Sequence, residues 1–181
     1  MTYNQYGLSV VTEPAIEPLT LTETKEFLRV EDSNSDNFIN NLILVARQAA
    51  EQFLKKALIT QTLKITYDQY APCQIELPMQ PVQSVDNVDI ISQDLSITNF
   101  NSTAYYLSAG NKYLIFEAVP IGDFIEITYQ AGYGDNITDV PEAIRQAMLM
   151  HIAKMYDNRT GTVTMPIAAK HLYIPYRKID L

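Results

Sequence analysis

Residues 131–159 read Ala-Gly-Tyr-Gly-Asp-Asn-Ile-Thr-Asp-Val-Pro-Glu-Ala-Ile-Arg-Gln-Ala-Met-Leu-Met-His-Ile-Ala-Lys-Met-Tyr-Asp-Asn-Arg, and they join a strand end, a glycine turn and a helix. Asp139 and Pro141 favour a helix start, because one offers a side-chain acceptor and the other lacks an N–H. Apolar residues then recur at helical spacing: Ile144, Met148, Ile152 and Met155. The stretch predicts a helix that packs against other elements, and it contains no catalytic constellation.

Two further helices are predicted near the N-terminus. Thr20-Leu-Thr-Glu23 is a capping-box pattern, which predicts a short helix ending at about Leu28. After a polar break, residues 36–56 carry an apolar stripe that is too wide for one partner, so this helix is expected to be covered on more than one side. Six residues are expected in the core: Leu42, Val45, Phe53, Ile144, Met148 and Ile152.

The middle of the chain changes from helical to alternating periodicity. Five to seven short strands are predicted, at 62–67, 73–77, 85–91, 105–107, 113–116 and 123–129, with turn residues between them. They are expected to form an antiparallel sheet or a small barrel. Because helices precede and follow this block, we predict an α+β fold. It is a helical bundle of two N-terminal helices and one C-terminal helix, with an inserted antiparallel β subdomain and an extended C-terminal tail.

The expected domain organisation follows these elements. Residues 1–18 are predicted to be an extended arm, residues 19–58 and 138–159 a helical layer, residues 59–137 the inserted β subdomain, and residues 160–181 a C-terminal docking tail.

The tail supplies the candidate interface residues. It combines a basic charge with apolar and aromatic side chains that are expected to be exposed and to need a partner surface. The candidates for contact with a partner protein or a neighbouring subunit are Leu172, Tyr173, Ile174, Pro175, Tyr176 and Arg177. The alternative is that the tail folds back onto its own subunit.

The negative charge is concentrated in the middle of the chain. The formal net charge is −8, and residues 65–144 hold eleven acids and one base, Lys112, whereas residues 145–181 hold two acids and six bases. A segment of this charge repels a phosphate backbone, so sequence-independent DNA binding through it is disfavoured. A solubilising surface is the simpler interpretation.

No residue set in the sequence points to catalysis, a cofactor or a metal. The two histidines, His151 and His171, belong to no nucleophile or metal-ligand motif. Gly132-Tyr-Gly134 lacks the Lys-Ser/Thr that follows a phosphate loop, so a turn is favoured. The lone Cys73 excludes an internal disulfide and is expected to be a small buried hydrophobe. We therefore predict no enzymatic activity, no cofactor and no metal.

Several segments of the chain, taken together in their order along the sequence, carry a resemblance to a known protein family. They are residues 19–30, Ala57-Leu-Ile-Thr-Gln-Thr62, residues 75–85, Ile127-Thr-Tyr-Gln-Ala-Gly-Tyr-Gly134 with the following Val-Pro-Glu-Ala helix, and Pro175-Tyr-Arg177. Together they resemble the tailed-bacteriophage head-tail connector (adaptor, head-completion) protein family. The resemblance covers most of residues 19–177.

The resemblance implies a structural virion protein without catalysis. Members of the family form a ring, expected here to hold twelve copies, under the portal protein and link the DNA-filled head to a stopper or tail-completion protein. DNA would pass through this ring without specific binding, and the protein would be assembled in the bacterial host cytoplasm and reside in the virion neck.

No membrane partner and no secretion are expected. The N-terminus has neither a basic region nor an apolar core, and no apolar run approaches the roughly 20 residues of a membrane span. Two other function classes stay open: a small β-rich binding module or accessory domain with a ligand pocket, and a nucleic-acid-binding packaging factor, which the charge distribution disfavours.

Overall fold

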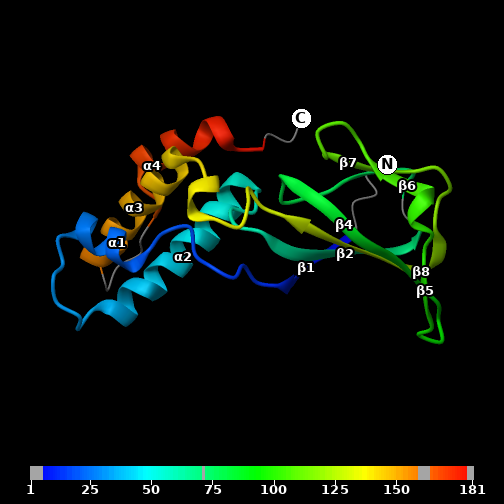
Figure 1. Ribbon diagram of the computed structural model, residues 1–181, viewed down its shortest axis with the longest axis horizontal. Helices are drawn as coiled ribbons and strands as arrows, with labels where there is room; N and C mark the ends of the chain where they lie inside the picture. The colour runs from blue at the N-terminus through cyan, green and yellow to red at the C-terminus, as the bar shows by residue number, and fades with distance from the viewer. Residues whose placement is uncertain (1–5, 71, 159–163, 179–181) are drawn as a thin grey trace. The chain divides into compact units, whose positions relative to one another are not determined.

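The computed structural model describes residues 6–70, 72–158 and 164–178. The chain divides into two compact units (Figure 1). Met1–Pro14 and Thr60–Gly132 form the first, called here the β unit, and Ala15–Ile59 and Tyr133–Leu181 form the second, the helical unit. The mixed α+β class is confirmed, with four helices and antiparallel sheets in the described part of the chain.

The helical unit contains α1 (Leu21–Leu28), α2 (Asp36–Leu54), α3 (Glu142–Asp157) and α4 (Ile167–Tyr173). The predicted cap of α1 is present, because the Thr20 hydroxyl accepts the Glu23 N–H at 3.1 Å. Both α1 and α2 end where one residue turns left-handed, Arg29 at φ 56° and Lys55 at φ 58°. Sequence periodicity therefore located three of these helices, and α4 lies in the segment that was predicted to be an extended tail.

The core of the helical unit lies where α2, α3 and α4 meet. Leu42, Ile144, Met148 and Ile152 are buried as predicted, whereas the side chain of Val45 is 46% exposed, so its predicted burial is wrong. Successive helical residues point about 100° apart, and the buried stripe of α2 follows the neighbouring Ala46. Phe53 packs against the core but is only partly buried.

The start of α3 differs from the sequence-based expectation. The Asp139 carboxylate accepts the Asn136 N–H at 2.9 Å and caps the short 3-10 helix η2 (Ile137–Asp139) instead of α3, which follows Pro141. Gly134 makes this arrangement possible, because a Cβ there would lie 2.2 Å from Asp139 Oδ2. The predicted turn at Gly132–Gly134 is therefore a packed junction in which a side chain at position 134 has no space.

The β unit contains eight strands in its described residues. They are β1 (Tyr6–Thr12), β2 (Gln61–Tyr70), β3 (Gln74–Glu76), β4 (Val82–Ile91), β5 (Ile97–Asn99), β6 (Tyr105–Leu107), β7 (Tyr113–Phe116) and β8 (Ile121–Ala131), with the 3-10 turn η1 (Ser102–Ala104) before β6. They form one sheet in the order β1-β2-β8-β4-β5 and another in the order β3-β7-β6. Every pairing is antiparallel.

Two strands of this unit are additional to those predicted. β1 lies in the segment expected to be an extended arm, and it pairs with β2 in the register Val10↔Leu63. β5 pairs with the end of β4, with Ile97 opposite Ile91. Both are edge strands whose sequences lack a buried alternating face, so their pairing depends on the neighbouring strand. The expected arm residues 1–5 lie outside the described residues.

Alternation buries one face of the paired strands β2 and β8 in the β unit. Leu63, Ile65 and Tyr67 of β2 are buried, as are Ile125, Ile127 and Tyr129 of the paired β8. The Tyr129 hydroxyl donates to the Pro78 carbonyl at 2.9 Å.

Cys73, which was expected to be buried, is exposed. It directly precedes β3, and it contributes its carbonyl to the Phe116 N–H at 2.9 Å rather than its side chain to the core.

Candidate assembly surface

The C-terminal residues form an ordered part of the helical unit. α4 packs on α3, and the 3-10 turn η3 (Ile174–Tyr176) continues from it. The Tyr173 side chain is fully buried. The sequence-based expectation that Tyr173 is exposed is therefore wrong, because its ring fills the helical core. Residues 160–163 and 179–181 of the predicted tail lie outside the described residues.

Three contacts fix this segment to the end of α2. The rings of Tyr173 and Phe53 have centroids 5.8 Å apart. The Arg177 guanidinium lies 5.0 Å from the centroid of the Phe53 ring, a cation–π distance. The Lys178 N–H donates to the Leu54 carbonyl at 3.0 Å. The segment is consequently held at both ends, from Tyr173 to Lys178.

The candidate interface residues divide into two groups. Leu172, Tyr173 and Tyr176 pack against the helical core, whereas Ile174, Pro175 and Arg177 are exposed. The exposed group is extended by three residues of α4 that sequence reasoning missed. We call the combined set the C-terminal surface: Ile167, Lys170, His171, Ile174, Pro175 and Arg177.

A signal for the missed residues was present in the sequence. Positions 167, 170, 171 and 174 follow the spacing i, i+3, i+4 and i+7, which places them on one side of a helix. The Ile167 side chain is 72% exposed and the Ile174 side chain 55% exposed. The C-terminal surface thus combines two exposed isoleucines with basic side chains, a composition suited to an apolar partner surface that carries acids.

The buried polar groups of the helical unit are not arranged for proton transfer. The Tyr173 hydroxyl has no hydrogen-bond partner among the described residues, and burial raises its pKa. His151 on α3 is buried, its Nδ1 has no partner in the described part of the chain, and burial lowers the pKa of the imidazole. Both groups are therefore kept neutral, and both act as core side chains.

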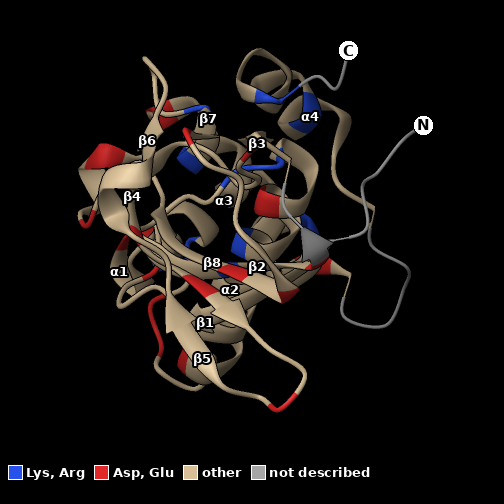
Figure 2. Cartoon of the chain, turned by 90° about the vertical axis from the view of Figure 1, so that its right-hand side faces the viewer, with Lys and Arg blue, Asp and Glu red and all other residues tan. Residues whose placement is uncertain are grey.

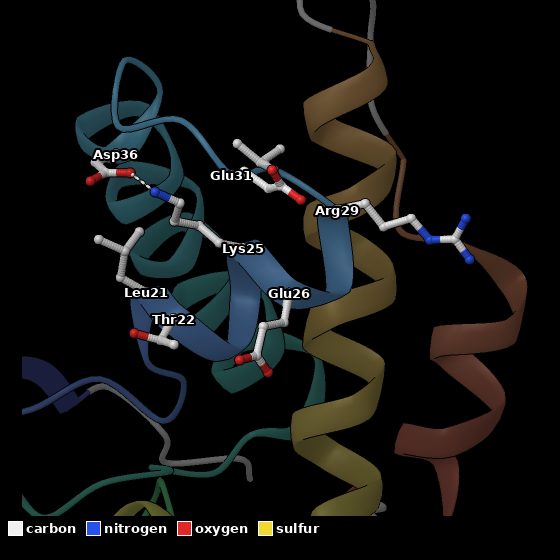
Figure 3. A pocket seen from close by; sticks show the side chains of 8 residues that line it. Leu21, Thr22, Lys25, Glu26, Arg29, Glu31 and Asp36 are labelled. Atoms are coloured by element: carbon white, nitrogen blue, oxygen red, sulfur yellow. Dashed lines mark hydrogen bonds and ion pairs between the residues drawn. The ribbon is translucent and has the colours of Figure 1, made fainter.

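One hollow lies along α1, with a volume of about 730 Å³. Lys25 Nζ and Asp36 Oδ1 form an ion pair of 2.6 Å at its edge. Figure 3 shows these two side chains pointing toward each other, while Arg29 points away from them. The charged groups do not converge on one point, so the hollow lacks the geometry of an acid–base or nucleophilic site.

The β unit carries most of the net charge. Its sequence holds nine acids and two bases, and Figure 2 shows the acidic positions in red among its strands. Both bases are paired: Lys64 with Glu126 at 2.9 Å and Lys112 with Glu76 at 3.3 Å. The acids that remain in excess leave this unit with a negative field.

Two of these acids lie directly opposite each other in the sheet. Asp89 of β4 pairs with Glu126 of β8 in the antiparallel register. Like charges at such a position destabilise a sheet. Lys64 of β2 offsets this through its ion pair with Glu126, and the Asn99 side chain donates to Asp89 at 3.1 Å. The charge is thus compensated within the sheet.

Metal and membrane sites find no support in the described residues. No group of three or more His, Cys, Asp or Glu side chains there could hold a metal ion. No helix in the same residues is long and apolar enough to cross a membrane.

Comparison with known proteins identifies the family. Residues 17–165 match the head completion proteins. The chain belongs to the head completion protein family. This membership confirms the resemblance to phage connector proteins, and head completion is a structural role in the virion rather than an enzymatic one. No curated protein is similar enough to the chain to count as a match.

Three solved structures share the fold of this head completion protein. A chain in the neck of an empty GTA particle, computed with C6 symmetry, has a TM-score of 0.80, 20% identity and coverage of 97% of both chains. A chain in the virion of a native gene transfer agent particle has a TM-score of 0.80, 22% identity and coverage of 96% of both. A chain in the neck of a native GTA particle, computed with C12 symmetry, has a TM-score of 0.72, 21% identity and coverage of 97% of both.

Proposed function

We propose that this head completion protein is a head-tail connector that forms a ring under the portal and links the DNA-filled head to the stopper or tail. The observation that carries the proposal is the family match over residues 17–165. The likeness in fold to neck chains of GTA particles, over 97% of the chain, supports the same role. The protein would then reside in the virion neck after assembly in the host cytoplasm.

The ring is proposed to hold twelve copies. One similar neck structure was computed with C12 symmetry and another with C6 symmetry, and both symmetries are compatible with twelve chains. Cyclic rings require heterologous contacts, in which one patch of a subunit meets a different patch of the next. Each copy of this chain must therefore present two distinct interaction surfaces besides those for the portal and the stopper.

The C-terminal surface is proposed as the contact with the portal or a neighbouring subunit. Its isoleucines are exposed although the rest of α4 is packed, and exposed apolar side chains beside Arg are typical of interface centres. Because Tyr173 and Lys178 anchor the segment, little ordering is required when the surface docks.

The acidic β unit is proposed to let DNA pass without specific binding. Both of its bases are held in ion pairs, so the described residues of this unit offer no basic stripe to a phosphate backbone. If the packaging-factor alternative held instead, the protein would bind DNA with an affinity that falls steeply with salt.

The proposal is tested by imaging and by a binding measurement. The purified chain is mixed with its portal protein and examined by negative-stain microscopy, where an added ring density is expected. Ile174→Glu should weaken portal binding at least about tenfold, the factor that corresponds to 1.4 kcal/mol. Thr22→Glu, an exposed position on α1 of the same unit, is the matched control and should bind like the wild type. A wild-type chain that adds no density to the portal would refute the connector role.

A further inference from the structure

The exposed side of α2 contains no charged residue. After Asp36, the charged residues of α2 are Arg47 and Glu51, and both point inward, with exposed fractions of 3% and 6%. The solvent-facing positions are instead uncharged. We call them the neutral face: Asn37, Asn40, Asn41, Leu44, Val45, Gln48 and Gln52.

This distribution differs from that of an ordinary surface helix in its charges alone. A surface helix normally turns charged and polar residues to water and apolar residues to the core, whereas the exposed side of α2 is polar without being charged. The centre of a protein interface, in contrast, is depleted in charged residues. The Leu44 and Val45 side chains are 37% and 46% exposed at the middle of the face. The neutral face thus has the composition of an interface.

The inward charges fix which side of α2 faces outward. Arg47 Nε lies 2.9 Å from Glu17 Oε2, and Arg47 Nη1 lies 3.1 Å from Glu51 Oε2. The other oxygen of Glu51 accepts the Leu58 N–H at 2.9 Å. Because a buried ion that loses its partners is strongly destabilising, α2 cannot rotate to bring charge to its surface. Figure 1 shows α1, α3 and α4 gathered along one side of α2, and the residues of the neutral face are exposed.

We propose that the neutral face is the surface through which one copy of this chain contacts the next. The inference rests on the ring proposed above. Copies of a chain with a net charge of −8 repel one another, so they associate most readily through a surface without charge. Asn and Gln side chains both donate and accept hydrogen bonds, so they can pair with polar groups of either kind on a different patch of the next copy, as a ring requires. A foreign partner selected by charge would gain nothing from this face.

The test is sedimentation of the full chain from micromolar to millimolar concentration, with two substitutions at one position. Wild-type protein is expected to self-associate reversibly. Gln48→Glu adds a negative charge without changing side-chain size, and Gln48→Lys adds a positive one. Because either charge must be desolvated inside the contact, both should weaken self-association at least about tenfold. Thr22→Glu is the control for added charge outside the face, and circular dichroism verifies that each variant is folded.

The two charge signs separate burial from general repulsion. If Gln48→Lys associates as tightly as wild type or more tightly, position 48 lies outside the contact and the proposal is overturned. A wild type that stays monomeric at millimolar concentration also overturns it. Wild-type rings that both Gln48 variants abolish support the neutral face even when the portal is not bound, and in that case it is the connector role that fails.

Discussion

Replacing Tyr173 by Phe should stabilise the protein, although it removes a polar group from the core. The Tyr173 side chain is fully buried and its hydroxyl has no hydrogen-bond partner among the described residues. A buried polar group without a partner costs about 1–3 kcal/mol. Phe keeps the ring against Phe53 and removes that cost, so a gain of about 1 kcal/mol in the free energy of unfolding is expected at the low end of this range.

The assay is thermal and urea unfolding of Tyr173→Phe beside Tyr173→Ala. A gain of 1 kcal/mol corresponds to a rise in Tm of about 2–4 °C for a chain of this length. Tyr173→Ala removes the ring itself and should cost about 3–5 kcal/mol. A clear loss of stability in Tyr173→Phe would refute the reasoning, because it would show that the hydroxyl has a partner. A small effect of Tyr173→Ala would show that α4 is not part of the core.

The same substitution predicts a pH effect of definite sign. Burial raises the pKa of Tyr173 above its ordinary value of 10.0. A folded-state pKa above the unfolded value means that the stability from this group is fully present below pH 10 and is lost as the pH rises above it. The advantage of Tyr173→Phe over wild type should therefore widen in alkaline buffer, and a constant difference between pH 8 and about pH 11 would contradict the raised pKa.

Three further perturbations test the helical unit. Arg47→Met leaves Glu51 buried without its ion pair and should lower the free energy of unfolding in urea by about 3–5 kcal/mol; a loss below about 1 kcal/mol would mean that Glu51 is solvated. Gly134→Ala should cost about 1 kcal/mol in the same assay, because the new Cβ displaces the Asp139 cap. His151 has a pKa lowered by burial, so the stability from this group is present above pH 6.5 and is lost as the pH falls. His151→Phe should accordingly flatten the decline in Tm between pH 7 and about pH 5.

The helices and strands that sequence analysis located are those whose capping residues or apolar periodicity lie within the element itself. The capping box at Thr20 and the apolar spacing of α2 and α3 are encoded in adjacent residues, and so is the alternation of β2 and β8. The short edge strands β1 and β5 were missed because their side chains remain largely exposed and show no buried alternation. Their formation depends on a neighbour that is distant in the sequence.

The candidate interface was predicted in part, and the error has a physical cause. Apolar residues near a terminus can either meet a partner or complete the core of their own chain, and composition does not distinguish these outcomes. Spacing does, because Tyr173 lies about 120° around α4 from Ile167, toward the buried Ala169. A helical projection of 167–174 would have separated the inward aromatic from the outward C-terminal surface.

The distribution of charged and apolar residues on α2 connects its packing in the helical unit with the proposed contact between copies. Val45 was expected in the core because it lies within an apolar stripe, yet it is exposed on the same side as Asn41 and Gln48. The sequence predicted that the stripe of α2 is too wide for one partner, and the helical unit buries most of it but leaves Val45 on the neutral face. The buried Arg47 favours the same orientation of α2. Its ion pairs with Glu17 and Glu51 hold one side of the helix inward, so the neutral face stays outward. An uncharged, partly apolar face on a helix whose charges are internal therefore favours a partner, and in the ring proposed above the partner that fits an uncharged surface is the next copy.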